Sequence, residues 1–171
     1  MAETIQSLQI VVKILGEMRQ ATDLSTLSDV LNRDYTATYG NGTGASQANM
    51  WWHDQRSLGA SATEDLDLAG SLTSVFGTTI TLTSLKGIFV YASSANNAAN
   101  NLNVTRPAAN GITWLLAAGD GISLKPGAFL AWFDPSANGA TVTAGSADLI
   151  TFTNSAGTNT ITYDVFLLGE V

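Results

Sequence analysis

The chain has 171 residues, enough for one domain with a substantial core, and its hydrophobic content of 45% is ordinary for a folded protein. Charged residues make up only 12% of the chain, against about 25% in a typical soluble domain. The net charge of −7 and the lack of any Lys/Arg cluster argue against a nucleic-acid surface. The chain contains no cysteine, which excludes disulfides, thiolate nucleophiles and thiolate metal sites.

The few charges are unevenly distributed. Most of them fall between Glu3 and Asp67, and the rest of the chain is polar mainly through Ser, Thr, Asn and Gly. A surface short of charge is typical of a protein packed into an assembly, although a neutral secreted β-domain fits the composition as well. The apolar run Ile10–Leu15 follows no basic region and is too short to span a bilayer, so we expect synthesis without a signal peptide and no membrane partner.

The first forty residues give mixed signals. Residues 4–19 place apolar side chains at both helical and strand spacings, and the β-branched cluster Ile10–Val12 favours a strand. Residues 23–31 could hold one short helical turn with an Asp or Ser cap. Residues 35–39 alternate as a strand does, and the glycine-rich stretch Gly40–Gly44 predicts a loop.

The middle of the chain predicts more strands. Trp51 and Trp52 are adjacent, so in a strand they point to opposite faces, and one of them must lie under a neighbouring segment or subunit. In residues 62–70 the leucines at 66 and 68 are expected inward and the aspartates at 65 and 67 outward. Residues 85–92 form an almost continuous apolar strand.

The remaining residues alternate between short apolar runs and turn signals. We predict strands over 102–105, 112–117, 122–124, 128–133 and 140–143. At the C-terminus, Ala147–Thr153 and Thr160–Leu168 flank a small polar break, so we expect them to return on each other as a hairpin. The last strand should be central in its sheet, because Phe166 and Leu168 make its second face apolar near the terminus.

This spacing of turns without a long helix predicts an all-β fold, an antiparallel β-sandwich or jelly roll with an extended, partly irregular N-terminal segment. We expect residues 1–60 to form this segment as an arm that packs on a neighbouring subunit, and residues 61–171 to form the sandwich. Two strands are apolar on both faces, with Phe89 and Tyr91 in one and Phe129 and Phe133 in the other. A two-layer sandwich buries one face of a strand, so either the N-terminal residues or a second copy must cover the other.

The sequence gives little support for a catalytic site. The one histidine, His53, has Asp54 beside it in sequence, and in a strand the two would point to opposite faces, so no base for a nucleophilic serine is expected. Glu64, Asp65 and Asp67 could pair for glycoside hydrolysis, but a solvated acidic edge explains them better.

The sequence signals for a ligand-binding site are equally weak. No loop has the oxygen spacing of a calcium site, and Gly40–Gly44 lacks the Lys and helix of a phosphate loop. We predict no catalytic residue, no metal and no cofactor. A sugar-stacking platform is the remaining possibility, and it would use all four tryptophans: Trp51, Trp52, Trp114 and Trp132.

Three phrases of the sequence carry a resemblance. Trp52–Arg56, Ala62–Gly70 and Val142–Asp148 resemble small virion structural proteins of tailed bacteriophages. The β-rich, cysteine-free character also resembles jelly-roll head decoration, or cement, proteins. The resemblance runs from about Tyr35 to the end and rests on turn and strand phrases, not on a catalytic signature.

The resemblance implies a non-enzymatic protein on the outer capsid surface, made in the bacterial cytoplasm, that bridges major capsid subunits as a dimer or trimer. A tail or fibre-associated protein and a carbohydrate-binding module are the alternatives. The expected interface combines the N-terminal segment with eight side chains: Trp51, Trp52, His53, Arg56, Phe89, Tyr91, Phe129 and Phe133.

Overall fold

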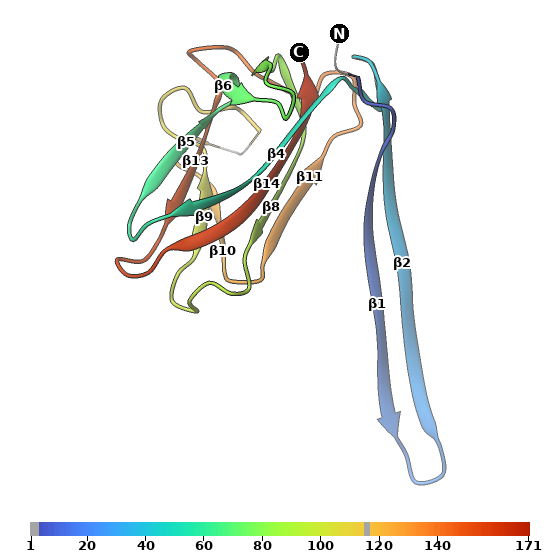
Figure 1. Cartoon of the computed structure of the whole chain (residues 1–171). Helices are drawn as coiled ribbons and strands as arrows, with labels where there is room; N and C mark the ends of the chain where they lie inside the picture. Colours follow the sequence, from blue (N-terminus) through green and yellow to red (C-terminus); the bar gives the residue numbers. More distant parts are fainter. Residues whose placement is uncertain (1–3, 115–116) are drawn as a thin grey trace.

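The computed structural model describes residues 4–114 and 117–171, and throughout these residues the regular secondary structure is strand, with no helix. The predicted all-β class is confirmed: apart from one two-residue parallel contact, the strands pair antiparallel in sheets. The molecule consists of a β-sandwich and a long two-stranded hairpin, which we call the arm (Figure 1).

The arm is formed by β1 (Leu8–Ala21) and β2 (Thr26–Asn41), which pair without interruption from Leu8↔Tyr39 to Ala21↔Thr26. At about 3.4 Å per residue, a 14-residue strand is roughly 45 Å long. The turn at its tip is well formed, because the Thr22 amide donates to the Ser25 carbonyl at 2.8 Å. The preference for a strand over residues 4–19 is confirmed from Leu8 onward, and residues 4–7 precede the strand.

The short helical turn predicted for residues 23–31 is wrong. Its Ser and Asp residues suit a turn as well as a helix cap, and the pairing of β2 with β1 continues to Thr26. Tertiary hydrogen bonding has therefore overridden a local capping signal.

The sandwich has two main sheets. The arm-side sheet has the order β11-β8-β14-β4, with β12 added beside β8, and the far sheet has the order β10-β9-β13-β5. The arm-side strands are β4 (Met50–Leu58), β8 (Ser84–Ala92), β11 (Phe129–Phe133), β12 (Ala140–Thr141) and β14 (Ile161–Glu170). The far strands are β5 (Thr63–Asp67), β9 (Leu102–Thr105), β10 (Gly121–Leu124) and β13 (Leu149–Asn154). Three short strands complete the fold: β3 (Gln47–Ala48), which pairs with β2, and the ribbon β6 (Ala69–Thr73) with β7 (Thr79–Thr81).

The predicted boundary at residue 60 is wrong. Strand β4 pairs with β14 from Met50↔Gly169 to Leu58↔Ile161, so it belongs to the sandwich. The arm is therefore shorter than expected, and the sandwich begins at Met50.

The predicted C-terminal hairpin is also wrong. Strands β13 and β14 follow each other in sequence, but β13 pairs with β5 and β9 in the far sheet while β14 pairs with β4 and β8 in the arm-side sheet. The loop after Asn154 thus crosses from one sheet to the other. The central position of β14 is confirmed, since it has a hydrogen-bonded neighbour on each side.

The main core lies between the two sheets and includes the inward residues of β5, β8, β13 and β14. Leu66 and Leu68 are buried, as predicted. The strand predicted over residues 112–117 is not found in its described part, where Gly111 makes a single bridge to Leu149 and a turn follows. Residues 115 and 116 lie outside the described residues.

Candidate functional site

The outer face of the arm-side sheet, turned away from the main core, carries a cluster of aromatic side chains that we call the aromatic face. The strand register places them in three rows across β11, β8, β14 and β4. Its members are Trp51, His53, Phe89, Tyr91, Phe129, Phe133 and Phe166. Three ring contacts join them, from Phe89 to Phe129 with centroids 5.8 Å apart, from Phe133 to Phe166 at 6.4 Å and from Trp51 to Phe166 at 6.5 Å.

The base of the arm covers one end of the aromatic face. A second hydrophobic cluster joins Ile5, just before β1, and Tyr39 of the arm to Leu168 of β14, with Phe133 and Phe166 packed against it. Burial, with a smaller contribution from Asp134, raises the pKa of Tyr39. The N-terminal residues therefore provide part of the cover that the two-sided apolar strands require.

Beyond this base the cover stops and a groove opens. Its walls are Leu8 and Ile10–Lys13 of β1 on one side, and Phe89, Phe129, Ala131, Phe133 and Phe166 on the other. The volume of the groove is about 390 Å³. Phe129 is exposed at its mouth. Apart from Lys13, the groove is thus apolar on both walls, and it is open to solvent.

The arm itself is amphipathic. Because directly paired residues lie on the same side of a hairpin, the register assigns to one side of the ribbon the pairs Leu8/Tyr39, Ile10/Ala37, Val12/Tyr35, Ile14/Arg33, Gly16/Leu31, Met18/Asp29 and Gln20/Leu27. We call this side the arm face. It is buried at Tyr39, but the apolar side chains farther along are exposed, Met18 at 73%. The other side of the ribbon is mainly polar and includes Lys13, Asp34, Glu17 and Arg19.

The charges of the arm differ between its two sides. On the polar side, Lys13 Nζ lies 3.6 Å from Asp34 and Arg19 Nε lies 2.7 Å from Glu17. On the arm face, Arg33 and Asp29 flank Leu31, and within residues 4–114 and 117–171 neither forms an ion pair.

The predicted interface residues separate into two groups. Six of the eight lie on the aromatic face, and Trp51 and Trp52 do point to opposite sides of β4, with exposed fractions of 38% and 8%. Trp52 is a correction, because its side chain belongs to the main core. Arg56 is a second correction, because its side chain, 31% exposed, turns to the side opposite the aromatic face and pairs with Glu64 of the far sheet.

Arg56, Glu64 and Tyr163 form a clamp that joins the sheets. The Arg56 guanidinium lies 2.5 Å from Glu64 of β5 and 3.1 Å from Asp54, and the Tyr163 hydroxyl of β14 donates to the same Glu64 carboxylate. Burial by itself would raise the pKa of Glu64, but the hydrogen bonds from Arg56 and Tyr163 outweigh it and lower that pKa. Burial and the bond to Glu64 raise the pKa of Tyr163. The clamp is a structural tie.

The predicted alternatives for chemistry do not assemble. Asp54 points toward Arg56 while His53 lies opposite Phe166 on the aromatic face, so the two do not form a His–Asp pair. Asp65 accepts from the Thr151 hydroxyl at 2.5 Å, and Asp67 accepts from the Ala69 amide at 2.8 Å. These two carboxylates of β5 accept hydrogen bonds from β13 and from the start of β6, and they do not face each other across a cleft.

The four tryptophans do not form one platform. Trp114 and Trp132 contact each other with centroids 5.6 Å apart and pack against the main core, Trp52 is buried in it, and Trp51 lies on the aromatic face. In the described part of the chain no group of three or more His, Cys, Asp or Glu side chains is placed to bind a metal ion. The same residues include no helix long and apolar enough to cross a membrane.

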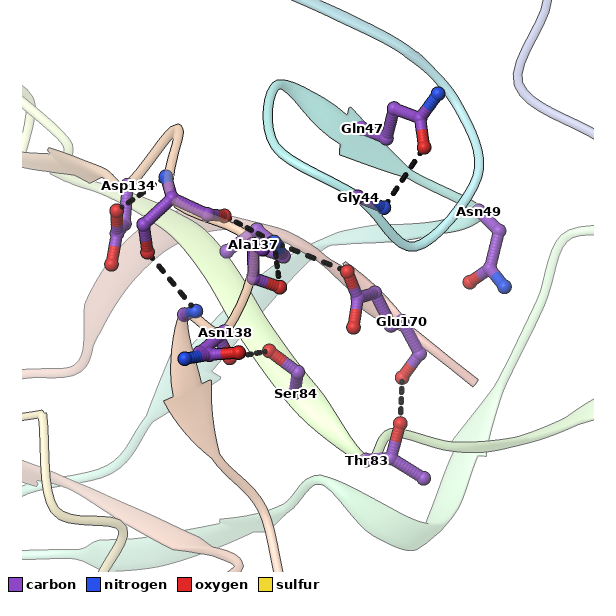
Figure 2. A network of polar contacts seen from close by, with 12 residues as sticks. Gly44, Gln47, Asn49, Thr83, Ser84, Asp134, Ala137, Asn138 and Glu170 are labelled. Carbon is purple, nitrogen blue, oxygen red and sulfur yellow. Dashed lines mark hydrogen bonds and ion pairs between the residues drawn. The ribbon is translucent and has the colours of Figure 1, made fainter.

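A second buried tie fixes the rim of the arm-side sheet beside the C-terminus. Lys86 of β8 is completely buried, and its ammonium donates to the carbonyls of Ser136 and Ala137, the latter at 2.6 Å. The Lys86 ammonium also lies 3.1 Å from Glu170 Oε1. This oxygen accepts no hydrogen bond of good geometry, so the contact is an ion pair only. Figure 2 shows Glu170 and Ala137 converging on this point, with Thr83 donating to the Glu170 backbone.

Sequence reasoning placed Phe166 on the apolar second face of the last strand but left it out of the interface, and it missed the arm face and Lys86. The arm face had a usable signal: apolar residues alternate on both sides of the Thr22–Ser25 turn, which is the pattern of a hairpin. For Lys86 there was no such signal, because its burial depends on carbonyls fifty residues away.

No protein family, curated protein or solved structure matches the chain.

Proposed function

We propose that this protein is a non-enzymatic structural component of a virion, a decoration or cement protein that stabilises a bacteriophage head by self-association and by bridging major capsid subunits. Its working surfaces are the arm face and the aromatic face. In this proposal the protein acts through buried area and needs no reaction centre.

The observation that carries the proposal is the uncovered arm face. An isolated two-stranded hairpin is marginally stable in water, and it normally needs a third strand or a packed layer. Here most of a ribbon roughly 45 Å long has no such layer, and its exposed apolar side chains extend from Val12 to Leu27. Contiguous exposed apolar surface of this extent marks a binding site for another macromolecule.

The strand order of the sandwich gives further support. If the eight main strands are counted in chain order from β4, omitting the short strands β6, β7 and β12, the arm-side sheet reads 6-3-8-1 and the far sheet 5-4-7-2. This alternation between sheets, with the last strand between the first and the third, is the jelly-roll arrangement used by many capsid proteins. We therefore interpret the sandwich as a jelly roll.

The remaining support is the low charge content together with the resemblance of three sequence phrases to phage virion proteins. A protein that is solvated on all sides normally uses more charge to remain soluble. A chain with 12% charged residues and two connected apolar surfaces is better suited to an assembly.

The proposal is tested by the copy number of the protein in purified particles. A cement protein is present in hundreds of copies and a tail or fibre-associated protein in few, so a stained gel of purified virions separates the two. Absence of the chain from particles contradicts both roles, and saturable glycan binding by the isolated protein would instead favour a carbohydrate-binding module.

A variant can connect particle binding to the aromatic face. Trp51→Ser changes an exposed side chain, so the protein should remain folded but join particles poorly. Ser57→Ala, on the same face of β4 and also exposed, is the matched control. Trp52→Ser is unsuitable because it would damage the core. Normal incorporation of Trp51→Ser would count against the aromatic face as the docking surface.

A further inference from the structure

We propose that the arm face binds the arm face of a second copy of this chain, antiparallel about a two-fold axis at Leu31, and that the tip of each arm fills the groove of the other copy. This inference rests on the proposed self-association and specifies how it takes place.

The charges on the arm face are complementary to themselves. Arg33 and Asp29 lie at equal distances on either side of Leu31, on the same side of β2. When two copies of β2 face each other in opposite directions with Leu31 at the axis, each Arg33 lies opposite the partner's Asp29. A two-fold axis makes this pairing twice, as an isologous interface requires. The other charges of the two arm strands already have partners within the chain.

The apolar residues match in the same arrangement. Positions equally far from Leu31 face each other, so Tyr35 lies opposite the partner's Leu27 and the two leucines at position 31 meet at the axis. Gly16 is paired with Leu31 and has open space where a side chain would be. This hollow gives the two leucines room to pack when the ribbons approach to the usual sheet spacing of about 10 Å.

The length of the arm connects its tip to the groove. Thr26 and Thr36 lie equally far from Leu31 in opposite directions along β2, so Thr26 of one copy faces Thr36 of the other. The turn that precedes Thr26 therefore falls beside Ile10 and Ala37 of the other copy. Ile10 is part of the groove wall. The turn carries Leu24, which is fully exposed in the single chain. One arrangement therefore covers the arm face and places an apolar side chain at the groove of each copy.

Charge reversal on the full-length protein tests the pairing. Arg33→Asp places like charges opposite each other in a homodimer, and Asp29→Arg does the same, so each variant alone should dimerise about tenfold more weakly than wild type. Mixed in equal amounts, the two variants should form a heterodimer of near wild-type affinity. Analytical ultracentrifugation measures both constants. Asp34→Arg, on the polar side, is the matched control: alone it should dimerise like wild type, and mixing it with Arg33→Asp should not restore wild-type affinity.

Cross-linking tests the side of the ribbon and the axis. Since the chain lacks cysteine, Leu31→Cys introduces a single thiol. Facing ribbons are too far apart for a disulfide, so a short bis-maleimide is the reagent. Leu31→Cys should give covalent dimers. Val30→Cys is the control on the opposite side of β2, where the native residue is 67% exposed compared with 46% for Leu31, and it should give none.

The outcomes separate this inference from the proposed function. If wild type self-associates but both charge variants match its affinity, or if cysteines at 30 and 31 cross-link equally, the arm pairing is wrong while self-association stands. If wild type remains monomeric at high concentration, both the arm pairing and the homo-oligomeric part of the proposed function fail. All altered positions are exposed, and circular dichroism verifies that each variant is folded.

Discussion

Replacing Lys86 with Met removes the cation that organises the rim of the arm-side sheet. The ammonium is completely buried and interacts with two carbonyls and Glu170, which is itself buried. Met preserves the length of the side chain but leaves the two carbonyls without this donor and the Glu170 carboxylate without its cation. Breaking one partner of a buried ion pair typically costs about 3–5 kcal/mol, which for a domain of this size corresponds to a fall in Tm of roughly 6–20 °C.

Urea unfolding followed by tryptophan fluorescence measures the loss in the free energy of unfolding. The double variant Lys86→Met/Glu170→Leu removes the stranded carboxylate as well, so it should be less destabilised than Lys86→Met alone. Hydrogen exchange should also accelerate in the segment 134–139, which Lys86 holds to the sheet. A Lys86→Met variant within about 1 kcal/mol of wild type would refute the reasoning, because Glu170 and the two carbonyls would then have been satisfied in another way.

Three further predictions concern the sandwich. Because the folded-state pKa of Glu64 is lowered, its contribution to stability is present above pH 4.5 and is lost as the pH falls below that value. Glu64→Gln should therefore reduce the loss of stability between pH 7 and pH 3. If the urea midpoints of Glu64→Gln and wild type fall equally over this range, the clamp is contradicted. Gly87→Ala places a methyl group against the Phe133 ring and should cost about 1–3 kcal/mol; thermal unfolding without a fall in Tm would show that the ring moves freely. Trp52→Ala should cost about 3–5 kcal/mol and Trp51→Ala much less; equal losses in urea unfolding would mean that the base of the arm buries Trp51 more tightly than its exposure indicates.

Several features of the fold follow from the sequence because they depend only on neighbouring residues. Alternation with a period of two identified most of the strands, and it placed Trp51 and Trp52 on opposite faces whatever sheet β4 joins. Apolar residues on both faces of β8 and β11 showed that a layer outside the sandwich was needed, and the base of the arm supplies part of it. The glycine and asparagine turns likewise set the spacing of the strands.

The tertiary structure decided which strands pair and what is buried between them. A polar loop of the length of 155–160 can join two strands of one sheet or cross between sheets, so local sequence could not tell that β13 and β14 lie in different sheets. Once β5 and β14 are on opposite sheets, Glu64 meets Arg56 and Tyr163, and the clamp exists only because of that crossing. The burial of Lys86 also depends on distant residues: its two carbonyl acceptors and Glu170 come from segments far along the chain, and long-range contacts of this kind leave no mark in the residues around it.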